Sequence, residues 1–294
     1  MPAPGGLLGA HVSIAGGVVQ APERARAIGA TAMQVFTKTP NQWREPEIPV
    51  DTGRVFRQRC RQCGIRAVVA HDSYLINLAT PDRALRQRSL ESFVQELRRC
   101  STLGIRYVVS HPGNYMDHRG RGLVRNAAAY AEALERVPDP IVLIETTAGA
   151  GTALGARFEE LAEIRDRVPL PFRRRIACCA DTCHLFVAGY DLREAWDEVW
   201  GLWDRTLGRR VLRCLHLNDA LAPLGSRRDR HALIGEGTLG PEPFRRLMRE
   251  SRFARAVKVI ETPKGDDPVH TDRRMLRRLR AYARAPWRRG GGAG

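Results

Sequence analysis

Eight short apolar runs without polar alternation recur along this chain of 294 residues. Such runs are typical of parallel strands that are buried on both faces of a sheet. They cover residues 7–12, 32–36, 67–70, 107–110, 141–144, 176–180, 211–217 and 257–260. Segments with helical spacing of apolar residues lie between them, at 84–103, 127–134, 158–168, 192–207 and 243–248, and a last one spans 272–284. Strands that alternate with helices in this way predict an α/β fold, a single (β/α)₈ TIM barrel.

Nearly every apolar run ends in a residue that can bind a metal ion. These residues are His71, His111, Glu145, Asp181, His216 and Glu261. Burying one such group without a partner costs roughly 1–3 kcal/mol, so a polar residue at a strand end has to be satisfied or used. The C-terminal ends of the strands meet at one face of a TIM barrel, where active sites lie. The series therefore predicts that these side chains converge on one site.

Two local motifs add further candidate ligands. Asp181-Thr-Cys-His184 places a carboxylate and an imidazole three residues apart, and Asp229-Arg-His231 places another such pair two residues apart. Imidazole and carboxylate ligands suit Zn²⁺, with Mn²⁺ as an alternative at some positions, and no thiol is assigned to the set. At about three protein ligands per catalytic ion, the set predicts two or three ions and a bridging carboxylate. Such clusters activate water and stabilise in-line displacement at phosphorus.

The charge balance favours a polyanionic partner. Lys and Arg number 48 against 32 Asp and Glu, which gives a net charge of +16. Nucleic acid is the usual partner of so basic a chain, although a proteome rich in arginine would give the same balance. A basic chain with a multi-metal site indicates hydrolysis of phosphodiesters in nucleic acid.

Composition also predicts the organisation and location of the chain. A hydrophobic fraction of 43% without a break in the middle favours one catalytic domain, residues 1–285, followed by a basic, Gly-rich tail, 286–294, that we expect to be disordered. We see neither a secretory signal nor an apolar run that could span a membrane. Seven cysteines without framework spacing favour a reduced, cytoplasmic protein.

These motifs closely resemble those of the endonuclease IV family of apurinic/apyrimidinic (AP) endonucleases. The resemblance covers almost the whole chain, and its most specific segments are DTCH…AGYDL and DRH…GEG. The matching segments are GAHVSIAGG (9–17), HDSYLINL (71–78), HPG (111–113), IETTAGAG (144–151), DTCHLFVAGYDLR (181–193), HLNDA (216–220), GSRRDRHALIGEG (225–237) and ET (261–262).

The resemblance implies a (β/α)₈ barrel with three Zn²⁺ ions per chain. One ion would be held by His71, His111 and Glu145, a second by Glu145, Asp181, His216 and Glu261, and a third by His184, Asp229 and His231. The implied reaction is hydrolysis of the phosphodiester 5′ to an abasic site in duplex DNA by a metal-activated hydroxide, which leaves a 3′-hydroxyl and a 5′-deoxyribose phosphate. Glu145 and Glu261 would be catalytic and would position or polarise that hydroxide. Removal of blocking groups from 3′ ends and a monomeric state are also implied.

The resemblance further implies three sets of DNA contacts. Tyr74 matches an aromatic residue that the family inserts at the lesion, and Arg227, Arg228 and Arg230 lie where they could reach phosphates. The loop after the second strand contributes Lys38, Gln42 and Trp43. In that loop the chain departs from the family, because the uncharged Asn41 stands where many relatives carry an arginine.

Two other functions are compatible with parts of the pattern. A metal-dependent sugar isomerase or epimerase uses the same barrel and similar strand-end ligands, but it rarely needs the His184, Asp229 and His231 set or so basic a chain. A non-catalytic nucleic-acid-binding protein with structural metals is the other alternative. The number of bound metal ions distinguishes the first alternative, and strand cleavage distinguishes the second.

Overall fold

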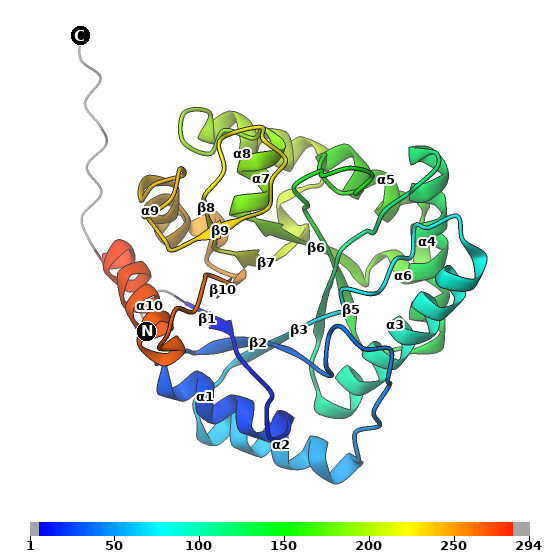
Figure 1. The fold of residues 1–294 in the computed structure, drawn as a ribbon, viewed down its shortest axis with the longest axis horizontal. Coiled ribbons are helices and arrows are strands. Elements are labelled where there is room, and N and C mark those ends of the chain that lie inside the picture. The colour runs from blue at the N-terminus through cyan, green and yellow to red at the C-terminus, as the bar shows by residue number, and fades with distance from the viewer. Residues whose placement is uncertain (1–5, 285–294) are drawn as a thin grey trace.

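The computed structural model describes residues 6–284, which form a closed barrel of eight parallel strands inside a ring of helices (Figure 1). The barrel strands are β1 (Leu8–His11), β2 (Ala32–Phe36), β3 (Ala67–His71), β4 (Tyr107–Ser110), β5 (Ile141–Glu145), β6 (Ile176–Asp181), β7 (Leu212–His216) and β10 (Val257–Ile260). They pair in chain order, and β1 closes the ring against β10, with Gly9 opposite Val259. The predicted (β/α)₈ barrel is therefore confirmed, and each predicted strand lies within two residues of an observed one.

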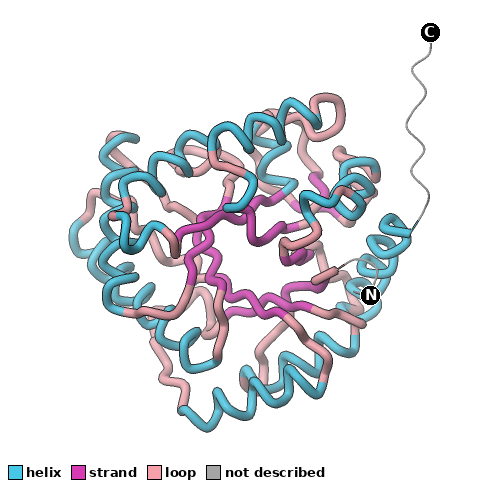
Figure 2. The backbone as a smooth tube through the Cα atoms, turned by 180° about the vertical axis from the view of Figure 1, so that it is seen from behind, coloured by secondary structure: helices cyan, strands magenta, loops and turns pink. Residues whose placement is uncertain are grey.

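The helices cover the outside of the barrel, as Figure 2 shows from the other side. They are α1 (Ala21–Ala27), α2 (Val50–Gln62), α3 (Arg83–Leu103), α4 (Arg119–Arg136), α5 (Phe158–Arg167), α6 (Leu170–Arg173), α7 (Thr182–Ala188), α8 (Trp196–Thr206), α9 (Glu242–Arg249) and α10 (Pro268–Arg284). Single 3₁₀ turns occupy Val18–Gln20, Arg209–Val211 and Ser251–Phe253. None of the described helices combines the length and the apolar character needed to cross a membrane. The predicted tail, 286–294, lies outside the described residues.

The sequence explains several boundaries. Helix α3 begins where the Asp82 carboxylate accepts a hydrogen bond from the backbone of Leu85 at 3.0 Å, and it ends at Gly104 in the left-handed conformation with φ of 73°. Gly9 permits close pairing of β1 and β2, because a side-chain carbon there would lie 1.6 Å from the carbonyl oxygen of Ala32.

Two apolar cores result. The larger one lies between the barrel and its helices and includes the fully buried Trp200 and Phe93. The second fills the inside of the barrel with small or branched side chains: Ala32, Val69, Val109, Leu143, Ala177, Cys179, Cys214, Val257 and Val259. This inner core closes the barrel, so the polar residues at the C-terminal strand ends have access to solvent on one face.

A short hairpin on that face was not predicted from the sequence. It pairs β8 (Asp219–Ala220) with β9 (His231–Ala232) in antiparallel fashion. The buried Asp219 carboxylate accepts hydrogen bonds of 2.8–3.1 Å from the backbone N–H groups of Ala220, Gly235, Gly237 and Leu239. The hairpin thus fixes the loop that carries the Asp229-Arg-His231 motif.

Candidate metal centre

The nine predicted ligands meet at the C-terminal ends of the barrel strands. His71, Glu145, Asp181 and His216 are the last residues of β3, β5, β6 and β7. His111 and Glu261 directly follow β4 and β10, His184 lies in the first turns of α7, and the hairpin supplies Asp229 and His231. Their side chains fall into three groups whose ligand atoms lie within 4.8 Å of one another. These groups are the three sets that the family resemblance implies.

The first group contains His71, His111 and Glu145. Both imidazoles face one carboxylate oxygen, because Oε2 of Glu145 lies 3.2 Å from Nε2 of His71 and 3.0 Å from Nε2 of His111. The side chain of His111 is 40% exposed, whereas those of His71 and Glu145 are buried. This group therefore has one side open to solvent.

The second group contains Glu145, Asp181, His216 and Glu261. Nδ1 of His216 lies 2.8 Å from Oε1 of Glu145 and 3.3 Å from Oε2 of Glu261. Since Glu145 turns one oxygen to each of these two groups, it occupies the position of a bridging ligand.

The third group contains His184, Asp229 and His231. The two oxygens of Asp229 lie 3.1 Å from Nε2 of His184 and 3.2 Å from Nε2 of His231. Asp181 connects this group to the second one, because its carboxylate caps α7 by accepting a hydrogen bond of 3.0 Å from the backbone of His184.

The electrostatic field of the site favours cations. Burial opposes protonation of His71, but the hydrogen bond and the charge of Glu145 outweigh it and raise the pKa of His71 to about 9. Burial likewise opposes protonation of His184, yet the charge of Asp181 and the hydrogen bond with Asp229 raise its pKa to about 10. Burial tends to raise the pKa of Glu145, but the neighbouring histidines hold it well below its ordinary value. The Glu145 carboxylate is therefore charged and requires positive partners.

The donor set fits divalent metal ions. Imidazole nitrogen and carboxylate oxygen are ligands that Zn²⁺ prefers. Nε2 of His231 is buried without a hydrogen-bond partner, although two carboxylates lie near it, which is the arrangement of a ligand atom directed at an ion. Two further groups of three donors include cysteines, namely Cys179 and Cys214 with His216, and Cys183 with Asp181 and His231. These thiols were not among the ligands predicted from the sequence.

Three polar residues that were not singled out in the sequence orient the ligands. The buried Gln34 donates from Nε2 to Glu261 at 2.5 Å, and its Oε1 lies 2.7 Å from Nε2 of His216. Asn218 donates to Asp181 at 2.6 Å and accepts from the backbone of Glu261 at 2.8 Å. His11 lies 3.6 Å from Glu261 and ends the first strand. The signal for His11 was a histidine at a strand end, whereas nothing local indicated the roles of Gln34 and Asn218.

A cavity of about 330 Å³ lies over these groups, and Tyr74 stands at its edge. The Tyr74 side chain is 68% exposed, and its ring meets Phe36 edge-on at 5.2 Å between ring centres. Phe36 also lies 4.4 Å from the ring of His11, so it supports Tyr74 from the barrel side. An exposed aromatic ring at the rim of the cavity is available for stacking.

The other predicted DNA contacts differ in their exposure. Arg227, Arg228 and Arg230 are exposed on the loop that carries Asp229. Gln42 is exposed, whereas Trp43 is half-buried beneath the guanidinium of Arg88, which lies 4.4 Å from the ring centre. Lys38 is buried with a side chain that is 2% exposed, and its ammonium group donates to Glu45 at 2.6 Å. Its position supports the loop from within.

Comparisons with known proteins agree with this geometry. Residues 22–280 match the family model of the xylose isomerase-like TIM barrel. A protein of Geobacter sulfurreducens with the curated name "Probable endonuclease 4" is 45% identical over 92% of this chain and 95% of its own length. The crystal structure of endonuclease IV from Thermus thermophilus is 36% identical, covers 94% of this chain and 98% of that chain, and gives a TM-score of 0.83.

A protein that resembles the sugar-converting enzymes is similar to this chain in its fold alone. A D-tagatose 3-epimerase-like protein superposes with a TM-score of 0.69 over 94% of this chain and 98% of that chain, but it is 16% identical. The endonuclease 4 proteins, by contrast, have substantial identity to this chain over nearly its whole length. The chain therefore belongs to the endonuclease IV family, within the xylose isomerase-like TIM barrel proteins.

Proposed function

We propose that this protein is a metal-dependent DNA-repair endonuclease that hydrolyses the phosphodiester 5′ to abasic sites in duplex DNA. The products would be a 3′-hydroxyl and a 5′-deoxyribose phosphate. The observation that carries the proposal is the convergence of nine ligand side chains in three groups beneath one rim cavity, in a chain of the endonuclease IV family. The net charge of +16 supports a polyanionic substrate.

We assign three Zn²⁺ ions to the three groups, with Glu145 shared between the first two. Bound divalent ions would supply Lewis acidity, which lowers the pKa of water and neutralises charge on the phosphate oxygens. The protein's contribution is to hold carboxylates and imidazoles at fixed positions, and Gln34 and Asn218 orient those side chains through the hydrogen bonds described above.

The two catalytic glutamates differ in access to substrate. The side chain of Glu145 is 1% exposed and is surrounded by histidines, so its role is to organise the site. Both glutamates line the rim cavity, but the side chain of Glu261 is 20% exposed. We therefore assign to Glu261 the position closer to the substrate, where its carboxylate would orient or polarise the metal-activated hydroxide.

Selection of the lesion would come from the rim. Flipping a nucleotide out of the duplex costs least where the base is already missing. Tyr74 can stack in the gap, while Gln42 and the exposed arginines of the Asp229 loop contact the backbone. A blocking group at a 3′ end is joined through the same kind of phosphodiester, but no nucleotide follows it. We therefore extend the proposal to the removal of such blocking groups.

The test is incision of a labelled duplex that contains one tetrahydrofuran abasic analogue. The analogue has no aldehyde, so a β-eliminating lyase cannot cut it. We expect cleavage 5′ to the lesion with a 3′-hydroxyl product, loss of cleavage after chelation, and no cleavage of the undamaged duplex. Elemental analysis of the purified protein should give three zinc ions per chain.

A folded, metal-loaded protein that leaves the analogue intact would refute the proposal. Tight binding of the analogue without cleavage would favour the non-catalytic DNA-binding alternative. One or two ions per chain, together with turnover of a keto sugar, would favour the isomerase alternative.

A further inference from the structure

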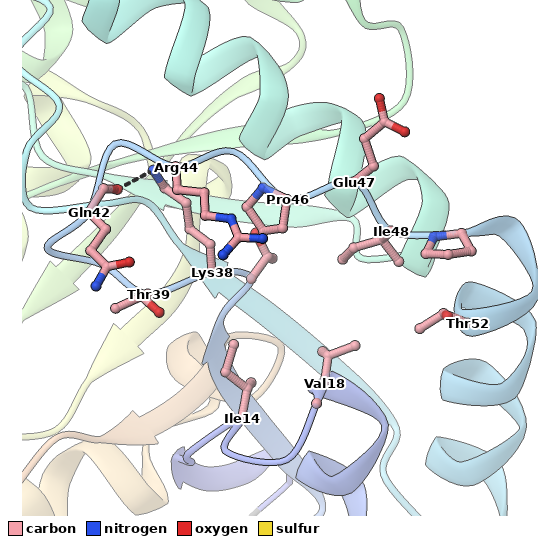
Figure 3. A pocket seen from close by; sticks show the side chains of 13 residues that line it. Ile14, Val18, Lys38, Thr39, Gln42, Arg44, Pro46, Glu47, Ile48 and Thr52 are labelled. Carbon is pink, nitrogen blue, oxygen red and sulfur yellow. Dashed lines mark hydrogen bonds between the residues drawn. The ribbon is translucent and has the colours of Figure 1, made fainter.

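Loop 37–49, which joins β2 to α2, is weakly held by its own backbone. Among the described residues, the backbone hydrogen bonds of the loop include one from the Gln42 N–H group to the Thr39 carbonyl at 3.3 Å. The Ser73 hydroxyl also donates a hydrogen bond to the Pro40 carbonyl. A cavity of about 370 Å³ separates the loop from residues 14–18 (Figure 3), and another of about 350 Å³ lies between Trp43 and α3. Packing against neighbours therefore does not by itself determine the shape of the loop.

A buried ionic network beneath the loop supplies the missing support. Arg99, on α3 and 3% exposed, donates to the hydroxyl of Thr37 at 2.7 Å, to Glu45 at 2.6 Å and to Glu96 at 2.7 Å. The Thr37 hydroxyl in turn donates to Glu96 at 2.7 Å. The network thus ties both the start of the loop and its later part, at Glu45, to one helix of the barrel.

Lys38 completes the network. Its ammonium group donates to Glu45 at 2.6 Å, to the Gln42 carbonyl at 2.8 Å and to the Ser92 hydroxyl at 3.4 Å. Figure 3 shows the bond that reaches the backbone at Gln42. All three protons of the ammonium group have acceptors inside the protein, so none is directed at solvent.

The charges of this network balance. Lys38 and Arg99 are matched by Glu45 and Glu96, and three of these four side chains are almost fully buried. Removing one partner leaves another as an uncompensated charge inside the protein, which is unfavourable, whereas the intact set specifies one loop conformation. The Lys38 charge is consequently used within the fold.

We propose that Lys38, Glu45 and Arg99 are positioning residues that hold loop 37–49 in the conformation that presents Gln42 to DNA, and that Lys38 contacts no phosphate. The link to DNA rests on the proposed function. The anchoring itself is a property of the free protein, so it is tested without any substrate.

The first experiment measures tryptic cleavage of the folded protein after Arg44, which is exposed on the loop. Glu45→Gln keeps the shape of the side chain and removes its charge, but it also changes the residue that follows the cleaved bond. Each rate is therefore divided by the rate at which trypsin cuts a short peptide of the same loop sequence. If Glu45→Gln releases the loop, this normalised rate should rise about tenfold or more. The matched control is Arg136→Met. It removes the two hydrogen bonds that Arg136, on α4, donates to Glu91 on α3, and it should leave the cleavage rate at Arg44 unchanged. Equal normalised rates in Glu45→Gln and wild type would overturn the anchoring role.

The second experiment measures affinity for abasic duplex as a function of salt concentration. Lys38→Met should weaken binding about tenfold or more by misplacing the loop, with the saturating cleavage rate kept within about twofold. The slope of log affinity against log salt should stay that of the wild type, whereas Arg228→Ala, which removes an exposed cation, should lower its magnitude by about 0.9. A comparable loss of slope in Lys38→Met would overturn the proposal.

The two failures are distinguishable. If Glu45→Gln releases the loop but wild type neither binds nor cuts abasic DNA, the proposed function fails and the anchor stands. If wild type cuts abasic DNA while both loop variants match it in affinity and in proteolysis, the anchor fails and the proposed function stands. Arg99→Met removes three hydrogen bonds and threatens folding, so the two milder variants carry the test.

Discussion

Replacing Gln34 by leucine should weaken metal binding without opening a cavity, because the two side chains are similar in size. The amide donates to Glu261 at 2.5 Å and lies 2.7 Å from Nε2 of His216. The bond to the charged Glu261 contributes roughly 1.5–3 kcal/mol, and the bond to His216, which is neutral when it binds an ion, roughly 0.5–1.5 kcal/mol. Together about 2–4.5 kcal/mol of orienting interaction is removed. Partners of this kind typically change metal affinity 10–100-fold, which corresponds to about 1.4–2.7 kcal/mol of binding free energy.

The assay is competition for zinc against a chromophoric chelator at neutral pH, followed for all bound ions. Lys258→Met is the matched control, because Lys258 is equally buried but donates to the Phe253 carbonyl at 2.6 Å on the outer side of the barrel. We expect the control to keep the zinc affinity of the wild type. A Gln34→Leu protein that binds every ion within about twofold of wild type would show that the amide does not orient the ligands.

Three further predictions follow from single side chains. Tyr74→Ala should reduce discrimination between abasic and intact duplex by about 5- to 150-fold, the equivalent of one stacked base, and equal losses on both DNAs would contradict the wedge role. Glu261→Gln should abolish cleavage yet retain most of the affinity for abasic duplex; near-normal cleavage would remove Glu261 from the mechanism. Burial lowers the pKa of Lys258 from 10.5 to about 8, so the folded protein loses this proton before the unfolded chain does. The penalty for the buried charge is present below pH 8 and is relieved as pH rises, so urea unfolding should show wild type gaining about 2 kcal/mol over Lys258→Met between pH 7 and 9.5. A constant difference between the two proteins would contradict that account.

The barrel could be predicted from sequence because its strands are short, mostly apolar runs. The convergence of six of the nine candidate ligands could be predicted because each lies at the end of such a run. Helix α4 was only half predicted, since Gly120 and Gly122 hide its first turns. Helices α1 and α7 were not predicted, and the hairpin was missed because its two strands are too short to show a period.

Burial of charged residues was the least predictable property. Lys38 resembles a DNA contact in sequence, because nothing local reveals that Glu45 and Ser92 surround it in the fold. Gln34 was missed for the opposite reason, since a single polar residue inside an apolar strand does not reveal the two candidate ligands that its side chain contacts. Pairings between residues distant in the chain decide both cases, and the proposed roles of these side chains depend on them.

Closure of the barrel by β1 against β10 has a consequence for how the metal centre is assembled. The ligand side chains are spread from His71 to Glu261, so no contiguous fragment shorter than most of the chain contains them all. Glu261 follows the strand that seals the seam, and it joins its group only when the ring is complete. Metal affinity would therefore report the integrity of the whole ring: a chelator would act as a denaturant, and a chain cut before β10 would lose both its seam and its second ion.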